Sequence, residues 1–147
     1  MLVLVALIVV LLLDQGLKLL VIHRLQHESI SLGSIGRVRR VPKQIWMIRL
    51  PRHLSLRSIW ILWIVGACAV AVLHNFVALS DWFCGLLLGG SLSHALETTW
   101  CGHICDYVCL RFWPAFNLAD IAITAGAIGV VTNLIQMTVN SSVQALL

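Results

Sequence analysis

Residues 1–22 read MLVLVALIVVLLLDQGLKLLVI, an apolar run broken near its end by one short polar group that contains Asp14 and Lys18. As a helix, a run of about 20 residues is long enough to cross the hydrocarbon core of a bilayer. Asp14 and Lys18 are four residues apart and therefore project from the same helix face. Since charged groups facing lipid are costly, we expect this face to point into a helix bundle or toward an interface. The alternative is a local ion pair near the membrane surface.

Three further apolar runs follow the first, and the whole composition agrees with them. The 147 residues are 60% hydrophobic and only 11% charged, whereas a soluble domain carries about 25% charged residues. We therefore predict an all-α integral membrane protein, a single membrane domain over residues 1–147. Its four transmembrane helices are expected at about 1–22, 58–79, 82–99 and 117–139. In the third run, Gly85 and Gly89 have the spacing that lets another helix approach closely.

Residues 23–57 form a polar, basic insert between the first two predicted helices. Glycine and proline interrupt it, the segment 45–50 has the pattern of a short strand, and Val38 and Val41 suit another. We expect a small extramembrane insert that is partly β. Most of the formal net charge of +4 comes from its arginines and lysine. These favour anionic lipid head groups over nucleic acid as a partner. By charge alone, the insert would lie on the cytoplasmic side.

Two aspartates near the end of the chain stand out chemically. Asp106 lies in the segment 100–116, predicted to be a loop, and Asp120 opens the fourth apolar run in the stretch FNLADIAI, residues 116–123. An ionisable group at the start of a membrane helix is costly and points to a function. Two carboxylates that hold one proton between them are the working groups of aspartic proteases. Asp106 and Asp120 are therefore candidates for one shared site.

The cysteines and histidines do not favour a metal site. Cys101, Cys105 and Cys109 would form one stripe if their segment were helical, and His103 lies nearby. However, structural zinc sites prefer closer cysteine pairs with histidine partners. We expect no metal, and packing of the thiols among apolar side chains instead.

The motifs together resemble those of the lipoprotein signal peptidases, or signal peptidase II. Residues 14–18, DQGLK, are similar to the Asp-Gln-x-x-Lys of that family's first span. Residues 89–92, GGSL, match the Gly-Gly-x-x of its third span, and residues 102–107, GHICDY, match Gly-x-x-x-Asp-Phe/Tyr. Residues 113–120, WPAFNLAD, are similar to the family's most specific motif.

This resemblance implies a bacterial membrane aspartyl endopeptidase, without cofactor, in the cytoplasmic (inner) membrane. Asp106 and Asp120 would be its catalytic dyad, one activating water and the other, protonated, polarising the scissile carbonyl. Asn117 would support the dyad, and Asp14 and Lys18 would brace the site. The implied substrate is a diacylglyceryl-modified prolipoprotein, cut before its lipidated cysteine, and the insert and catalytic loop would face the outside. Membrane lipids are the other expected partner.

Some family positions differ in this chain. Where the family has Gly-Asn-x-x-Asp-Arg in its third span, this chain has Ser93, His94, Glu97 and Thr98, and the insert lacks an Asn-x-Gly-Ala segment. His94 can still hydrogen-bond as a supporting or substrate-binding residue, but threonine cannot replace a guanidinium fork. One alternative is therefore a catalytically impaired family member that serves as a structural or binding subunit of a larger membrane complex. Another is a pigment- or haem-binding subunit with His74 and His94 as ligands.

Overall fold

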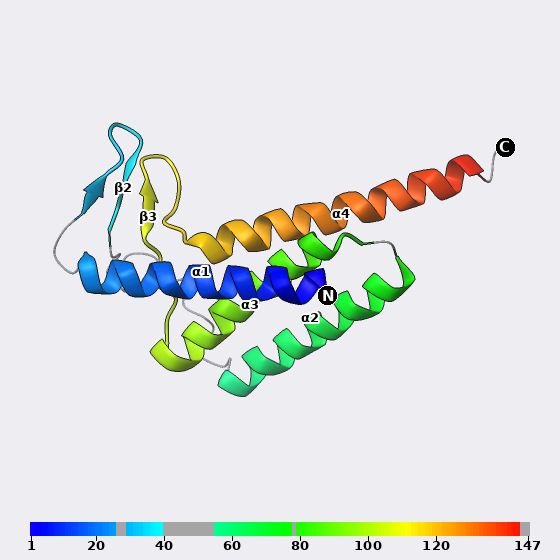
Figure 1. Cartoon of the computed structure of the whole chain (residues 1–147), viewed down its shortest axis with the longest axis horizontal. Helices are drawn as coiled ribbons and strands as arrows, with labels where there is room; N and C mark the ends of the chain where they lie inside the picture. The colour runs from blue at the N-terminus through cyan, green and yellow to red at the C-terminus, as the bar shows by residue number, and fades with distance from the viewer. Residues whose placement is uncertain (26–28, 40–54, 78, 145–147) are drawn as a thin grey trace.

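Four helices and a small three-stranded sheet make up the described part of the chain (Figure 1). The computed structural model describes residues 1–25, 29–39, 55–77 and 79–144. The element bounds, in chain order, are α1 (Leu2–Arg24), β1 (Ile30–Ser31), β2 (Gly36–Val38), α2 (Leu56–Phe76), α3 (Asp81–Cys101), β3 (Val108–Leu110) and α4 (Leu118–Gln144). The four predicted spans are thus present as helices, with ends that differ by a few residues from the predicted ones. Helix α3 begins at Asp81, with Ser80 as its N-cap.

Helix α3 is the centre of the bundle, since it packs against each of the other three helices. The predicted close approach at Gly85 and Gly89 is confirmed. A Cβ atom built on Gly85 would lie 2.5 Å from the Ala6 Cβ of α1, and one on Gly89 would lie 2.8 Å from the Leu7 carbonyl oxygen. Gly90 faces the Ala119 backbone of α4 in the same way. Because glycine has only a hydrogen atom as its side chain, α3 can contact the backbones of α1 and α4 directly at these positions.

Helix α2 lies beside α3 and contains no buried residue (Figure 1). Two tryptophan side chains attach it to α3. The Trp60 indole N–H donates to the Thr99 hydroxyl oxygen at 3.0 Å, and the Trp63 indole N–H donates to the Ser91 hydroxyl oxygen at 3.2 Å. Both partly buried indole N–H groups thus have hydrogen-bond partners on α3.

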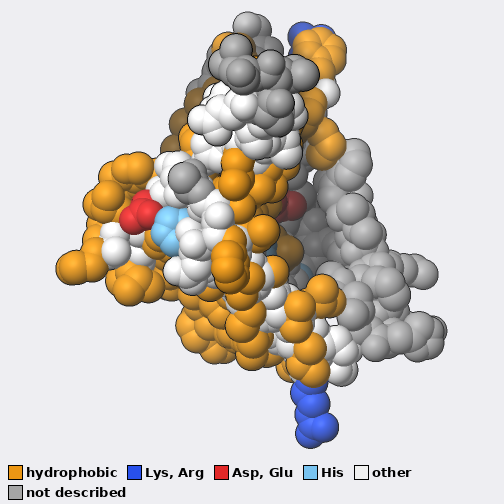
Figure 2. Space-filling view, turned by 90° about the vertical axis from the view of Figure 1, so that its right-hand side faces the viewer, with side chains coloured by type: hydrophobic (Ala, Val, Ile, Leu, Met, Phe, Trp, Pro, Cys, Tyr) orange, Lys and Arg blue, Asp and Glu red, His pale blue; other side chains and the backbone are white. Residues whose placement is uncertain are grey.

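Several polar side chains are buried in the bundle and many apolar side chains are exposed on it, which is the opposite of a soluble protein. Asp14, Lys18 and Asn117 are at most 2% exposed, whereas Leu12 of α1 is 66% exposed and Leu62 of α2 is 65% exposed. Figure 2 shows mostly hydrophobic side chains over the described surface at the end of the bundle away from the sheet. Of the described helices, α1, α2 and α4 are long and apolar enough to cross a membrane. Helix α3 is less apolar because it contains polar and glycine residues. These residues can lie within the bundle because the neighbouring helices cover α3. The protein is a mostly helical, multi-pass membrane protein.

The sheet differs from the prediction in one respect. Strands β1 and β2 come from the insert, as expected, but β3 comes from the segment 100–116, which was predicted to be only a loop. The order is β1-β2-β3, all antiparallel, with Gly36 opposite Leu110 and Val38 opposite Val108. The strand predicted at 45–50 lies outside the described residues. Because β3 lies between Asp106 and α4, the sheet holds the segment that carries Asp106 at the end of the bundle where α4 begins (Figure 1).

Candidate active site

The start of α4 is a reciprocal helix cap that fixes Asp120. The Asp120 backbone N–H donates to the Asn117 side-chain oxygen at 3.1 Å, and the Asn117 backbone N–H donates to Asp120 Oδ2 at 2.9 Å. Asn117, Leu118, Ala119 and Asp120 thus reproduce the geometry of a capping box, in which the residues at N-cap and N3 satisfy each other's backbone donors. A local sequence signal therefore sets the position of the Asp120 carboxyl group.

Asn117 also connects Asp120 to Asp106. Its side-chain nitrogen donates to Asp106 Oδ1 at 2.9 Å, while its oxygen is occupied by the cap. Asn117 is fully buried, and both aspartates are partly accessible, with the Asp120 side chain 41% exposed. The structure thus brings together the three residues Asp106, Asn117 and Asp120 that the sequence singled out near the end of the chain.

The segment that follows Asp106 is held from two sides. Tyr107 is buried, and its hydroxyl oxygen accepts a hydrogen bond from the Leu118 N–H at 3.1 Å. The backbone N–H groups of Tyr107 and Val108 both point to the Phe116 carbonyl oxygen. Burial raises the pKa of the Tyr107 phenol to about 12, so it stays neutral at physiological pH. These bonds close the loop from Asp106 to α4 into a compact unit.

A buried ionic cluster lies beneath the two aspartates. Lys18 Nζ lies 2.7 Å from Asp14 Oδ2 and 2.6 Å from Glu97 Oε2, so one ammonium group serves two carboxylates. Lys18 is 2% exposed, Asp14 0% and Glu97 4%. Buried charges are tolerated only when they are paired and hydrogen-bonded. The face of α1 that carries Asp14 and Lys18 accordingly points into the bundle, as one of the two sequence alternatives proposed.

The same cluster holds the backbone immediately before each aspartate. Asp14 Oδ1 accepts from the N–H of Ala119, which precedes Asp120, at 3.0 Å. Glu97 Oε1 accepts from the N–H of Cys105, which precedes Asp106, at 2.9 Å. Lys18 thus joins, through two carboxylates, the two backbone segments that position Asp106 and Asp120.

Glu97 and Ser93 belong to this cluster, but the sequence interpretation did not include them among the site residues. The Ser93 hydroxyl donates to Asp14 Oδ2 at 2.5 Å, and Ser93 is fully buried. Gly89, Ser93 and Glu97 recur at intervals of four residues, which places them on one face of α3. A polar face of this kind within an apolar run was the signal that could have identified both residues.

His94 of α3 lies against the second aspartate. Its Nε2 atom is 3.0 Å from Asp120 Oδ1, and its side chain is 15% exposed. Thr98, one turn later, donates its hydroxyl to the His94 carbonyl oxygen at 2.7 Å. The threonine therefore bonds to its own helix backbone rather than reaching toward the aspartates.

The carboxyl groups of Asp106 and Asp120 lie in different electrostatic environments. Burial, followed by the negative charge of Asp120, raises the pKa of Asp106 above its usual range. The hydrogen bond from Asn117 opposes this shift only in part. Two carboxyl groups whose environments differ in this way can act as an acid and a base in one reaction.

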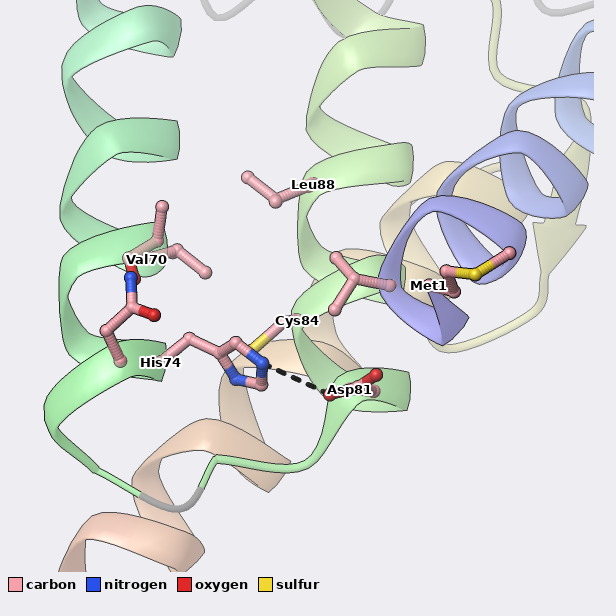
Figure 3. A pocket seen from close by; sticks show the side chains of 9 residues that line it. Met1, Val70, His74, Asp81, Cys84 and Leu88 are labelled. Atoms are coloured by element: carbon pink, nitrogen blue, oxygen red, sulfur yellow. Dashed lines mark hydrogen bonds and ion pairs between the residues drawn. The ribbon is translucent and has the colours of Figure 1, made fainter.

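The other membrane histidine lies at the far end of the bundle. Figure 3 shows His74 of α2 pointing to Asp81 at the start of α3, with Nε2 3.2 Å from Asp81 Oδ1. Both line an open cavity of about 270 Å³. Since a helix rises about 1.5 Å per residue, Asp81 and His94 are about 20 Å apart along α3. The two histidines therefore cannot ligate one haem or pigment between them.

The arrangement of the cysteines differs from the stripe considered from their spacing. Cys101 ends α3, Cys105 lies in the following loop and Cys109 lies in β3, so the three do not share one helix face. Among the described residues, no three histidine, cysteine, aspartate or glutamate side chains are grouped so that they could hold a metal ion.

Comparisons with known proteins agree with this architecture. The family model described as "Signal peptidase (SPase) II" matches residues 6–136. A lipoprotein signal peptidase of Xylella fastidiosa is 45% identical over 49 residues, covering 31% of this chain and 29% of that protein. The lipoprotein signal peptidase of Xanthomonas campestris pv. campestris is 36% identical over 85 residues, covering 48% of this chain and 51% of that protein. The matched part is thus at most about half the length of these curated relatives.

A solved structure extends the likeness over almost the whole chain. It is described as a bacterial membrane enzyme determined by the in meso method at 2.3 Å resolution, and it superposes with a TM-score of 0.73. The superposition covers 94% of this chain and 90% of that one at 19% sequence identity, which establishes a common fold. Together with the family match over nearly the full length, this shows that the chain belongs to the signal peptidase II family.

Proposed function

We propose that this protein is an aspartic endopeptidase that removes signal peptides from lipid-modified prolipoproteins in the bacterial cytoplasmic membrane. Membership of the signal peptidase II family supports the reaction class. The single structural observation that carries the proposal is the bridge made by Asn117, which bonds to both Asp106 and Asp120 at the end of the bundle next to the sheet.

The chemistry follows from two carboxyl groups that share one site. One carboxylate takes a proton from a water molecule, which attacks the scissile carbonyl carbon. The other carboxyl group, protonated, donates a hydrogen bond to the carbonyl oxygen and so stabilises the charge that develops there. Two like charges held together by Asn117 are unfavourable, which favours the form of the pair that shares one proton.

The location of the aspartates suits a lipid-anchored substrate. Asp120 lies in the first turn of the membrane helix α4, and Asp106 lies in the loop just outside it. A peptide bond next to a diacylglyceryl-modified cysteine would lie at the membrane surface, where the lipid chains can remain in the bilayer. The proposed substrate, cut just before its lipidated cysteine, fits a site at this depth.

The direct test is cleavage of a lipidated prolipoprotein by the purified protein in detergent or bilayers. The wild-type protein should release the signal peptide, and Asp106→Asn and Asp120→Asn should each abolish release. Asparagine at position 120 can still accept from the Asn117 N–H and so keep the reciprocal cap, so loss of activity in that variant would not reflect loss of the fold. Substantial cleavage by either variant would show that Asp106 and Asp120 are not the catalytic dyad.

Thr98 supports a second candidate function. The resemblance places an arginine at this position, and the Thr98 hydroxyl is bonded to its own helix. A family member without that guanidinium group could bind lipoproteins or another membrane subunit without cleaving them. Absence of cleavage by the wild-type protein, with retained binding of the lipidated substrate, would favour this binding role.

A further inference from the structure

We propose that His94 holds Asp120 as the ionised, water-activating member of the dyad and so makes Asp106 the protonated member. The catalytic part of this inference rests on the proposed peptidase function. The assignment of protons to His94, Asp120 and Asp106 is a property of the folded protein and can be tested without substrate.

The two carboxyl groups differ in the donors that surround them. Asp120 has a polar partner at each oxygen: the Asn117 backbone N–H donates to Oδ2, and His94 Nε2 lies 3.0 Å from Oδ1. Asp106 receives one hydrogen bond, from the Asn117 side chain to Oδ1, among the described residues. Hydrogen bonds to both oxygens stabilise the charged form of a carboxyl group. The anion is therefore better stabilised on Asp120 than on Asp106.

The environment of His94 determines which of its nitrogens carries the proton. Nδ1 is buried and has no hydrogen-bond partner among the described residues, whereas Nε2 faces Asp120. A proton on Nδ1 would leave a buried N–H without an acceptor, which is unfavourable, while a bare Nδ1 leaves only an unused lone pair. The neutral imidazole with its proton on Nε2 therefore fits the site, and it donates to the Asp120 carboxylate.

Asp106 responds to this arrangement as the protonated partner. Its carboxyl group is partly buried and feels the negative charge of Asp120, and both effects favour its neutral form. A protonated Asp106 keeps one O–H group to donate to the scissile carbonyl oxygen. Asp120 is thus the group that activates water, and Asp106 is the group that donates to the carbonyl oxygen.

At position 94 this chain has a histidine where the resemblance places an asparagine. An asparagine amide always carries a donor. A neutral histidine donates from Nε2 only in one tautomer, and the buried, unpartnered Nδ1 favours that tautomer here. The contact with Asp120 therefore depends on the environment of the His94 ring.

Nitrogen-15 NMR of histidine-labelled protein in bilayers tests the proton assignment. The His94 signal, identified by its loss in His94→Asn, should show a protonated Nε2 and an unprotonated Nδ1 at neutral pH. Asp106→Asn, which leaves the contact with His94 intact, should preserve this pattern, and Asp120→Asn should disturb it. A proton on Nδ1 at neutral pH, or an unchanged pattern in Asp120→Asn, would overturn the inference.

The kcat and KM of variants at position 94 test the catalytic consequence. His94→Leu should lower kcat by about ten- to hundredfold with little change in KM, because it removes a hydrogen bond to a charged group. His94→Asn should recover most of that loss, because its amide can also donate to Asp120. An unchanged kcat in His94→Leu, or no recovery in His94→Asn, would contradict the inference.

The two experiments separate the inference from the proposed function. A protein that cleaves nothing but shows the Nε2–H form of His94 bound to Asp120 would remove the peptidase function and retain the proton assignment. A protein that cleaves but shows a proton on Nδ1 would retain the peptidase function and remove the role of His94.

Discussion

At the scale of single residues, Asn117 carries two functions that are usually separate. Its side-chain oxygen caps α4 through the Asp120 N–H, and its side-chain nitrogen bonds to Asp106. An amide carries its acceptor and its donor on two different atoms of one short side chain, whereas a hydroxyl has both on a single oxygen. This explains why an asparagine, rather than another good capping residue, occupies the position between the two aspartates.

A pair of substitutions at Asn117 separates capping from catalysis. Asn117→Ala removes both bonds and should cost about 1 kcal/mol of stability through loss of the cap. Asn117→Ser keeps a capping oxygen but lacks the amide nitrogen that bonds to Asp106, so it should be nearly as stable as the wild type. We expect both variants to cleave poorly, measured as initial rates beside unfolding curves. Normal cleavage by Asn117→Ser would show that the bond to Asp106 is dispensable.

At the scale of elements, α3 supplies the polar contacts and the small residues that organise the bundle. One face offers Ser93 and Glu97 to the charged pair on α1, and the neighbouring position offers His94 to α4. Gly85 and Gly89 let α1 approach closely enough for these contacts to form. The geometry of the aspartates therefore depends on how closely these helices pack.

Substitution of Lys18 tests the buried ionic cluster. Lys18→Met would leave Asp14 and Glu97 buried without a cation, which costs about 3–5 kcal/mol for a broken buried pair. Glu97→Gln should be milder, because Asp14 and Lys18 still neutralise each other and glutamine can still accept from the Cys105 N–H. Adding Glu97→Gln to Lys18→Met should recover part of the loss.

The measurement is the free energy of unfolding in mixed micelles for both single variants and the double variant. The wild-type protein completes this double-mutant cycle. Strictly additive effects would show that Lys18 and Glu97 do not interact as the structure indicates.

Two glycine substitutions test the close packing of α1 on α3. A Cβ on Gly89 would lie 2.8 Å from the Leu7 carbonyl oxygen, a backbone atom that cannot move aside alone. Gly89→Ala should therefore push the helices apart, cost about 1–3 kcal/mol and reduce cleavage. Gly66→Ala on α2 is the matched control, since nothing lies within 4 Å of its added Cβ. Equal stability and activity of the two variants would contradict the packing described.

At the scale of the whole molecule, the four helices run back and forth, so the sheet and the two aspartates share one end of the bundle (Figure 1). The turn between α2 and α3 and the end of α4 lie at the other. The described arginines of the sheet region, including Arg37 and Arg111, are at the end with the aspartates. Charge alone favours the cytoplasm for that end, whereas the family resemblance favours the outside.

Thiol labelling in intact cells distinguishes these orientations. Cys101, exposed at the end of α3 near the sheet, should react with a membrane-impermeant maleimide when it is the sole cysteine. Ser142→Cys, in the exposed last turns of α4, should react only after the cells are permeabilised. The reverse pattern would place the aspartates on the cytoplasmic side and remove the proposed lipoprotein substrates.

The sequence by itself determined the features that depend on composition and on short spacing. Apolar runs of sufficient length predicted four membrane helices. A helix in lipid satisfies its own backbone hydrogen bonds, so it can be predicted without knowing how the rest of the chain packs. The four-residue interval of Asp14 and Lys18 predicted a shared helix face. These are local properties, and the structure contains the corresponding helices.

Only the tertiary structure decided which distant groups meet. Glu97 is the second partner of Lys18, Asp14 reaches the N–H of Ala119, and β3 completes the sheet from a segment predicted to be a loop. No periodicity encodes these contacts, since they arise where three helices and a loop pack together. The physical reason is that a buried charge is stable only beside a charged or polar partner. The packing of the whole chain decides which residue supplies that partner.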